Sequence, residues 1–292
     1  MMPYYNAAKT LPLALASLIA QTYENWECIL VDDGSTDCPL PIIEQAHDRR
    51  IKYFRLDKNM GRGMARQVAL DHATGSYLCM LDADDWLYPS KLQRQVEVMQ
   101  QEPDLALVSS GIAIVNTQNE IVGVRCKGAP DSEMTTSGPL TRLAPPSVAF
   151  APCMIRMGIA KQVRFDPSLR RSEDADFLLR ILLDHSYYVL PDVLYVYAEY
   201  VWATQDIWDG HKYRMRMFRK YSQRFPLSSL VNVGKTAAKL AMYRIVFALG
   251  LEKWMIARRS EPPTAEEANH FEQARQAVSA VANRLCYFRC PE

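Results

Sequence analysis

Residues 27–37, "ECILVDDGSTD", carry the clearest structural signal in this sequence. Cys28 to Val31 form a continuous apolar run that ends in two carboxylates, Asp32 and Asp33. A run without polar alternation is typical of a strand buried on both faces of a parallel sheet. The same pattern returns in "SYLCMLDADD" at residues 76–85, so we expect at least two such strands.

Strand and helix signals alternate around these two runs. This order predicts an α/β fold with a mostly parallel sheet, right-handed crossovers and helices on its faces. We expect strands at 27–33, 51–56, 76–81, 105–116, 121–124 and 147–155. We expect helices at 10–22, 37–47 (capped by Asp37), 61–73, 89–101 and around 173–185.

Strand signals disappear after residue 205. The remaining residues read as helices interrupted at Pro226 and at "SEPPT", residues 260–264. We therefore expect an α/β domain over residues 1–204 and a helical extension over 205–292. Residues 126–147 are rich in Pro, Gly, Ser and Thr and read as a loop.

The composition, 49% hydrophobic and 23% charged with a net charge of +1, is that of a globular protein and does not point to nucleic acid. Seven cysteines, an odd number without a preceding signal peptide, favour the reducing cytoplasm. The most hydrophobic long run, Leu240 to Ile256, contains Arg244, Glu252 and Lys253, which argues against a membrane-spanning helix.

Three acidic clusters follow strands or open a helix: Asp32–Asp33, Asp82–Asp85 and Glu173–Asp176. Any one of them could be a helix cap or a solvated rim. Open α/β sheets, however, bind ligands beyond the carboxyl ends of their strands, where these clusters are expected to meet. Carboxylates brought together repel one another unless a cation offsets the charge, so the pattern predicts a divalent metal.

The ordered motifs resemble family 2 of the nucleotide-sugar glycosyltransferases, which have the GT-A fold. Those motifs are Pro3-x-Tyr5-Asn6, "SLIAQTYENWECILVDDGSTD" (17–37), "NMGRGMARQVALDHATGSYLCMLDADDWLYP" (59–89) and "EDADFLLR" (173–180). The resemblance covers residues 1–200, about two thirds of the chain. It implies an inverting transferase that moves a sugar from a nucleoside-diphosphate sugar to an acceptor hydroxyl.

The resemblance implies a nucleotide site near the first motif. Pro3 and Tyr5 would lie at the base, with Tyr5 stacking on it, although a packed core aromatic is the alternative for Tyr5. Asp33 would accept from the base N3–H, which favours a UDP-sugar, although a guanine N1–H could also satisfy this carboxylate. "GRGMAR" (61–66) lacks the third glycine of a dinucleotide fingerprint, which argues against that class of site.

The same resemblance implies a metal and diphosphate site. Asp82 would face the ribose, and Asp84 or its neighbour Asp85 would hold Mg²⁺ or Mn²⁺ on the diphosphate. Arg66 would be a diphosphate or structural partner, with a solvated helix arginine as the alternative. The chain departs from many relatives after the last core strand, where "VYAEYVWATQ" (196–205) replaces an Arg-x-His element and Glu199 could substitute as a ligand.

Asp174 matches the family's catalytic base, which takes the proton of the acceptor hydroxyl as the new bond forms. Glu173 is implied to be at the substrate and either tunes Asp174 or caps the helix, and Asp176 is read as a cap. A single displacement at the anomeric carbon inverts it and needs no protein nucleophile.

In the GT-A arrangement the strand before Pro3 lies in the middle of the sheet, between the strands at 27–33 and 76–81. Met1 and Met2 would be its last residues, so we expect the natural gene to begin upstream and this first central strand to be truncated here. Unpaired buried backbone groups would otherwise be costly.

The charge is uneven: residues 200–292 carry 15 basic and 8 acidic side chains, and the preceding part is net acidic. Residues 211–224, "HKYRMRMFRKYSQR", would either contact an anionic membrane near a glycan or lipid-linked acceptor, at its inner face, or pack as an ordinary helix. Two rival functions remain: a non-catalytic nucleotide-sugar-binding protein and a sugar-nucleotide pyrophosphorylase. A pyrophosphorylase needs a Gly-rich basic loop near its first strand, and residues 3–10, "PYYNAAKT", do not contain one.

Overall fold

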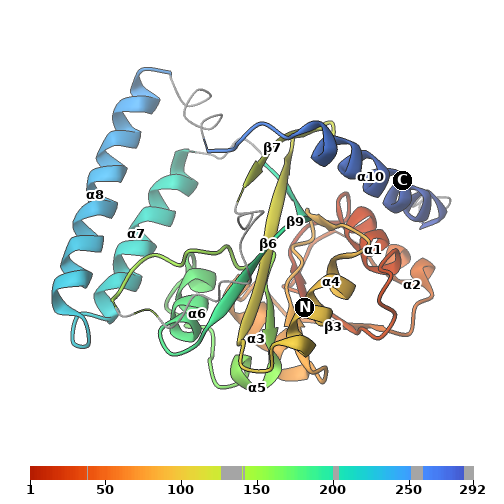
Figure 1. Cartoon of the computed structure of the whole chain (residues 1–292), viewed down its shortest axis with the longest axis horizontal. Helices are drawn as coiled ribbons and strands as arrows, with labels where there is room; N and C mark the ends of the chain where they lie inside the picture. Colours follow the sequence, from red (N-terminus) through yellow and green to blue (C-terminus); the bar gives the residue numbers. More distant parts are fainter. Residues whose placement is uncertain (38, 126–139, 141, 200–203, 251–258, 286–292) are drawn as a thin grey trace.

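The computed structural model describes the whole chain apart from residues 38, 126–139, 141, 200–203, 251–258 and 286–292. Within the described residues the predicted alternation of strands and helices is confirmed through residue 125. The loop predicted at 126–147 falls largely outside them. Figure 1 shows a central group of strands with helices on both sides.

The first half of the chain builds a parallel sheet of order β1-β2-β3. Its strands are β1 (Met2–Tyr4), β2 (Cys28–Asp32) and β3 (Ile51–Arg55), and every residue of β2 is buried, as its unbroken apolar run predicts. The crossovers contain α1 (Leu11–Ile19) and α2 (Leu40–Ala46), and α3 (Arg62–His72) follows β3. Tyr4 pairs with Asp32, so β1 and β2 end at the same edge.

Strand β1 also links this sheet to β4 (Tyr77–Cys79). The amino group of Met1 donates to the carbonyl of Cys79 at 2.7 Å, and the amide of Leu81 donates to the carbonyl of Met1 at 3.1 Å. The segment before the Pro3 motif therefore lies between β2 and β4, as expected. A cavity of about 540 Å³ lies beside Met1, with Trp26, Tyr77 and Met157 among its lining residues.

The second half differs from the expected mostly parallel sheet. Its order is β4-β8-β6-β9-β5, with β7 paired to β6. Four of the seven described strand pairings are antiparallel, and β6 with β9 is the parallel pair here. The strands are β5 (Trp86–Leu87), β6 (Leu107–Val115), β7 (Ile121–Arg125), β8 (Met154–Arg156) and β9 (Tyr187–Ala198).

Short connections account for that difference. A turn at residues 116–120 joins β6 to β7, which is too short for the crossover a parallel pair needs. The strand expected at 147–155 is reduced to β8, because residues 147–153 form bends and turns. The remaining helices of this half are α4 (Lys91–Gln101), α5 (Met157–Ala160) and α6 (Glu173–Leu182).

The helices after residue 204 pack in two separate places (Figure 1). α10 (Ala265–Leu285) lies against α1, and its buried Phe271 contacts Trp86 at 5.5 Å between ring centroids. α7 (Thr204–Lys220) and α8 (Pro226–Ala248) form a hairpin on the other side, where Met217 and Phe218 pack with α6. Among the described residues, no helix combines the length and hydropathy needed to cross a membrane.

Candidate active site

A pocket of about 700 Å³ opens beyond the carboxyl ends of β1, β2 and β4. It brings together five of the residues predicted from sequence, which lie as much as 81 positions apart in the chain. They are Pro3, Tyr5, Asp33, Asp82 and Asp84. Ligand sites of open α/β sheets occur at this edge because strands and backbone dipoles end there together.

The Pro3-x-Tyr5-Asn6 motif forms the turn that leaves β1. Asn6 adopts a left-handed backbone with φ of 51°, its amide donates to Ser35 Oγ at 2.9 Å, and its Oδ1 accepts from the amide of Thr36 at 2.8 Å. These bonds tie the turn after β1 to the turn after β2. Tyr5 is 47% exposed and lines the pocket, so the packed-core alternative for Tyr5 is wrong.

Asp33 is buried at the pocket wall and accepts two backbone hydrogen bonds. The amide of Met60 donates to Oδ1 at 2.7 Å and that of Gly61 to Oδ2 at 2.9 Å. Burial raises the pKa of Asp33, and these two bonds partly oppose the rise. Each carboxylate oxygen still has a second lone pair with which to accept a ligand N–H.

Glycine is required beside Asp33. Gly34 has φ of 71°, and a Cβ at this position would lie 2.5 Å from the backbone carbonyl carbon of Lys58. The close approach brings the 58–61 segment onto Asp33, which no larger residue would permit.

The carboxylates of the acidic turn at residues 82–85 lie in different surroundings. Asp85 is buried, and its Oδ2 accepts from the Tyr195 hydroxyl at 2.7 Å while its Oδ1 accepts from the amide of Ala198 at 2.9 Å. Burial and the charges of its two acidic neighbours raise the pKa of Asp85 well above its ordinary value. Asp84, by contrast, is exposed and lines the pocket.

Asp82 and Asp84 fit a divalent cation held jointly with a ligand. Desolvation of its carboxyl at the pocket wall and, to a lesser extent, the nearby charge of Asp82 raise the pKa of Asp84, and a cation between the two would relieve the second of these effects. The described residues contain no group of three or more His, Cys, Asp or Glu side chains arranged to hold a metal by themselves. Two protein carboxylates supplemented by phosphate and water oxygens are a usual arrangement for Mg²⁺.

Glu199, the residue suggested as a substitute ligand, is not among the described residues that line the pocket. Its Oε2 accepts from Arg125 Nη2 at 2.7 Å, so an ion pair already uses its charge. The neighbouring Tyr197 and Ala198 line the pocket, whereas residues 200–203 of the same stretch lie outside the described residues.

Arg66 is buried, so the solvated-helix alternative for this arginine is wrong. Its Nη1 donates to Glu173 Oε1 at 2.7 Å, and its Nη2 donates to Asp82 Oδ1 at 3.2 Å. Glu173 is also buried, which raises its pKa, while Arg66 opposes that rise. Neither side chain is among the described residues that line the pocket. The contacts of Arg66 agree with the structural alternative, in which it supports Asp82 and α6 from behind, and substrate contact by Glu173 stays a prediction.

Asp174 is half-buried in the first turn of α6. Its Oδ1 accepts from the amide of Ala175 at 2.7 Å. Arg170 and Arg171, just before it in the chain, line the pocket, but Asp174 is not one of the described lining residues. The predicted base thus stands next to the pocket rather than on its wall in this structure.

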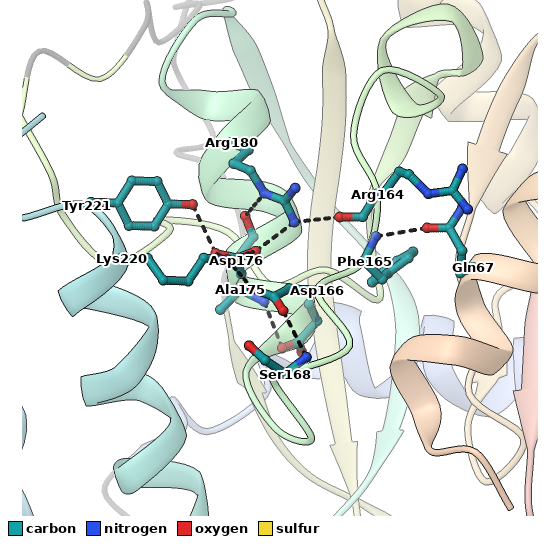
Figure 2. Close-up of polar contacts among 11 residues, drawn as sticks. Gln67, Arg164, Phe165, Asp166, Ser168, Ala175, Asp176, Arg180, Lys220 and Tyr221 are labelled. Carbon is teal, nitrogen blue, oxygen red and sulfur yellow. Dashed lines mark hydrogen bonds and ion pairs between the residues drawn. The ribbon is translucent and has the colours of Figure 1, made fainter. Parts of the chain in front are cut away.

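Asp176 is not the cap that its sequence position indicated. Figure 2 shows its carboxylate accepting from three side chains: Arg180 at 2.6 Å, Lys220 at 3.0 Å and Tyr221 at 3.0 Å. Lys220 also donates to Asp166 at 2.5 Å. This network fastens the start of α6 to the end of α7 and so fixes the helix that carries Asp174.

Sequence reasoning missed several residues of the pocket. Asp206, at the start of α7, pairs with Arg171 across the rim, so the helical extension contributes to the site. Spacing alone cannot reveal this contact because it joins two segments without a shared motif. The two adjacent arginines before "SED", Arg170 and Arg171, were a sequence signal that could have indicated a site for an anionic ligand. The missed lining side chains are Arg62, Arg170, Arg171, Tyr197 and Asp206.

Comparison with known proteins places the fold and the motifs in one family. The family model described as Glycosyl transferase family 2 matches residues 1–157, more than half of the chain. An uncharacterised glycosyltransferase of Haemophilus influenzae is 41% identical over 102 residues, which cover 34% of this chain and 41% of the relative.

A second relative has a named reaction. The Escherichia coli UDP-Glc:alpha-D-GlcNAc-diphosphoundecaprenol beta-1,3-glucosyltransferase WfgD is 34% identical over 122 residues, covering 42% of this chain and 47% of the relative. The chain thus spans less than half the length of these curated relatives in the matched segments.

Solved structures share the fold. S. aureus TarS 1–349 in complex with UDP-GlcNAc superposes with a TM-score of 0.61 at 20% identity, over 97% of this chain and 82% of that one. The mannosyltransferase PcManGT from Pyrobaculum calidifontis, in complex with GDP-Man and Mn²⁺, gives 0.56 at 17% identity, over 98% and 86%. These likenesses confirm the predicted GT-A architecture, and with the matched family model they establish that this chain belongs to glycosyl transferase family 2.

Proposed function

We propose that this chain is an inverting glycosyltransferase that moves a sugar from a UDP-sugar to a hydroxyl of a glycan or lipid-linked glycan. The observation that carries the proposal is the convergence of Tyr5, Asp33, Asp82 and Asp84 on one pocket at the carboxyl ends of the parallel strands. Pro3 holds the turn from which Tyr5 projects. We assign catalysis to residues 1–204 and treat 205–292 as the helical extension.

The nucleotide occupies the side of the pocket formed by Tyr5 and Asp33. An exposed aromatic ring offers its face to a base, and Asp33 offers its remaining lone pairs to the N3–H of uracil. Support for UDP comes from the UDP-GlcNAc bound to the TarS structure and the UDP-Glc named for WfgD.

Asp84, with Asp82, would hold Mg²⁺ or Mn²⁺ on the donor diphosphate. The bound ion would neutralise charge on the departing nucleoside diphosphate as a Lewis acid. Asp82 also faces the ribose side, while Arg66 behind it keeps the carboxylate in place at 3.2 Å. Asp85 belongs to the support of this turn, since both of its oxygens already accept hydrogen bonds from β9.

Asp174 acts as the general base. It removes the proton from the acceptor hydroxyl while that oxygen attacks the anomeric carbon and the bond to the diphosphate breaks on the opposite face. Its position in the first turn of α6 is held by Glu173 on one side and the Asp176 network on the other. Such assistance is worth roughly 10²–10⁴ in rate.

Our proposals for the acceptor and for the place of action are supported mainly by the relatives rather than by the geometry of the pocket. WfgD is named for a diphosphoundecaprenol-linked acceptor, which supports a lipid-linked glycan. The name of a Bacillus subtilis relative, a putative teichuronic acid biosynthesis glycosyltransferase, supports a role in cell-envelope polysaccharide synthesis. We place the reaction in the cytoplasm, at the inner membrane face. Contact of the basic helical extension with the membrane belongs to the same proposal.

The test is donor turnover by the purified chain with Mn²⁺ and a panel of nucleotide sugars. One donor should be hydrolysed slowly, Asp84→Asn should abolish this, and Asp174→Asn should reduce transfer without weakening donor binding. Asp104→Asn, an exposed carboxylate at the opposite end of the sheet, is the matched control. Tight donor binding without turnover on any acceptor would favour a non-catalytic binding protein instead. Formation of a sugar nucleotide from UTP and a sugar phosphate would favour the pyrophosphorylase.

A further inference from the structure

Helix α8 has the opposite polarity to an ordinary surface helix: its polar side faces the protein and its apolar side faces outward. Its buried side chains are largely polar, namely Ser229, Asn232, Thr236 and Tyr243. Its outward side chains are large and apolar, with exposed fractions of 78% for Leu227, 72% for Leu230, 62% for Ile245 and 65% for Leu249 just past the end of the helix.

The exposed apolar residues form one continuous stripe. Positions 227, 230, 231, 234, 238, 241, 242, 245 and 249 recur every three or four residues, which places them on one face of a helix. The smaller residues among them are Gly234, Ala238 and Ala241. The helix has 23 residues, so the stripe, which we call the outer face of α8, is roughly 35 Å long.

The outer face cannot turn inward. Asn232 Nδ2 donates to the carbonyl of Leu143 at 2.9 Å, and Ser229 Oγ donates to the carbonyl of Phe218 at 2.8 Å. These buried bonds fasten the polar side of α8 to the body of the protein. In Figure 1, α8 is the outermost helix, with α7 between it and the strands.

Positive charge borders the outer face. Lys235, Lys239 and Arg244 are exposed, and residues 226–248 contain no Asp or Glu. Neighbouring α7 adds exposed Lys212, Arg214, Arg216 and Arg219. An apolar stripe edged by long cationic side chains matches the interface of an anionic bilayer, where the stems stay in the apolar layer and the charges reach the headgroups.

We propose that the outer face of α8 lies in the surface of an anionic membrane. The interaction is peripheral, since no helix of the described residues is suited to cross a bilayer. This assigns the membrane contact to α8, whereas the sequence pointed to the basic residues 211–224 of α7 and its end. A second copy of the chain fits less well, because two such faces would bring the cations that border them together.

The C-terminal part of α8 packs on the part of α7 that reaches the rim of the pocket. Asp206 lines the pocket, and Trp208, two residues further along α7, packs against Phe247 of α8 with ring centroids 5.9 Å apart. A membrane that covers α8 would therefore lie on the side of the protein where the α7–α8 pair meets the pocket rim, and a lipid-linked sugar could reach the pocket from that side. Delivery of a lipid-linked sugar rests on the proposed function, whereas binding of α8 to the membrane is independent of any transferase activity.

Vesicle flotation of the full chain tests the proposal without donor or acceptor. Wild type should float with phosphatidylcholine vesicles containing phosphatidylglycerol and much less with phosphatidylcholine alone. Replacing Leu227, Leu230, Ile245 and Leu249 together by Ser should lower partition roughly tenfold or more, because each loses apolar area that the membrane would cover. Val122→Ser, at an apolar residue of β7 that is 53% exposed, is the control and should float as wild type does.

A second variant separates charge from apolar contact. Lys235→Gln, Lys239→Gln and Arg244→Gln together should remove the preference for phosphatidylglycerol. Far-ultraviolet circular dichroism confirms that each variant is folded. Wild type that never floats, or that forms a dimer broken by the four Ser substitutions, would overturn the proposal. Donor hydrolysis by the same sample reports on the transferase proposal separately.

Discussion

Arg66 and Glu173 form a buried ion pair, with Nη1 and Oε1 2.7 Å apart, that joins α3 to the first turn of α6. The same guanidinium reaches Asp82 at 3.2 Å. One buried cation thus holds both the carboxylate turn after β4 and the helix that carries Asp174. The two halves of the proposed reaction, donor and acceptor, share this support.

Replacing Arg66 by Met should destabilise the fold and reduce activity together. Removing Arg66 leaves buried Glu173 with only the more distant and half-exposed Arg62, at 3.7 Å, and breaking a buried pair typically costs about 3–5 kcal/mol. Urea unfolding measures the loss, and Arg164→Met, an exposed arginine paired with Asp71 at 3.4 Å, is the control with little expected effect. An Arg66→Met protein as stable as wild type would show that the pair contributes no net stability.

Tyr5→Ala should weaken donor binding while Tyr5→Phe should not. Stacking on a base is worth about 1–3 kcal/mol by alanine substitution, and Phe retains the aromatic face. Isothermal titration with UDP measures both. Since Tyr5 is 47% exposed, neither change should lower the unfolding midpoint much. Equal affinity of the Ala variant and wild type would remove Tyr5 from the nucleotide site.

Asp84 and Asp85 should respond differently to replacement by Asn. Asp84→Asn should sharply raise the Mn²⁺ concentration needed for donor turnover, since Asp84 lines the pocket. Asp85→Asn should leave that concentration nearly unchanged, because its carboxyl faces Tyr195 and Ala198 and burial favours its neutral form. If the Asp85 variant alone loses metal dependence, the assignment of the two residues is reversed.

The Asp166 contact should stabilise the fold at neutral pH but not in acid. Burial alone would raise the pKa of Asp166, but hydrogen bonds from Lys220 and Ser168 outweigh it and lower the pKa to about 2. A carboxylate with a lower pKa in the folded state stabilises above its unfolded pKa of 3.8 and loses this effect as pH falls towards 2.

Asp166→Asn should therefore lower the free energy of unfolding at pH 7 by up to about 1 kcal/mol, since the site is partly solvated. The difference from wild type should shrink as the pH falls below about 4. Urea unfolding over this range, with exposed Asp104→Asn as the control, measures it. A difference that grows in acid would contradict this assignment.

Local patterns predicted most elements of the first half. The apolar run at Cys28 to Val31 and the helix pattern at 61–73 appear as β2 and α3, because burial on both faces and helical periodicity are properties of short segments. The antiparallel pairings of β6, β7 and β8 were not predicted, since pairing partners depend on chain reversal through turns. Residues 147–153 show the same limit: apolar residues there are buried without forming a strand.

The sequence by itself determined the family, the α/β order and the identity of the acidic residues at the strand ends. Tertiary structure alone decided which of those residues meet the pocket: Asp33, Asp82 and Asp84 line it, while Arg66, Asp85 and Glu173 support it from behind. It also revealed that α8 turns its apolar side outward and that Asp206 reaches the rim. The physical reason is that a sequence motif does not distinguish neighbouring aspartates of one turn. Which carboxylate is buried and which faces the pocket depends on how the turn packs against other elements.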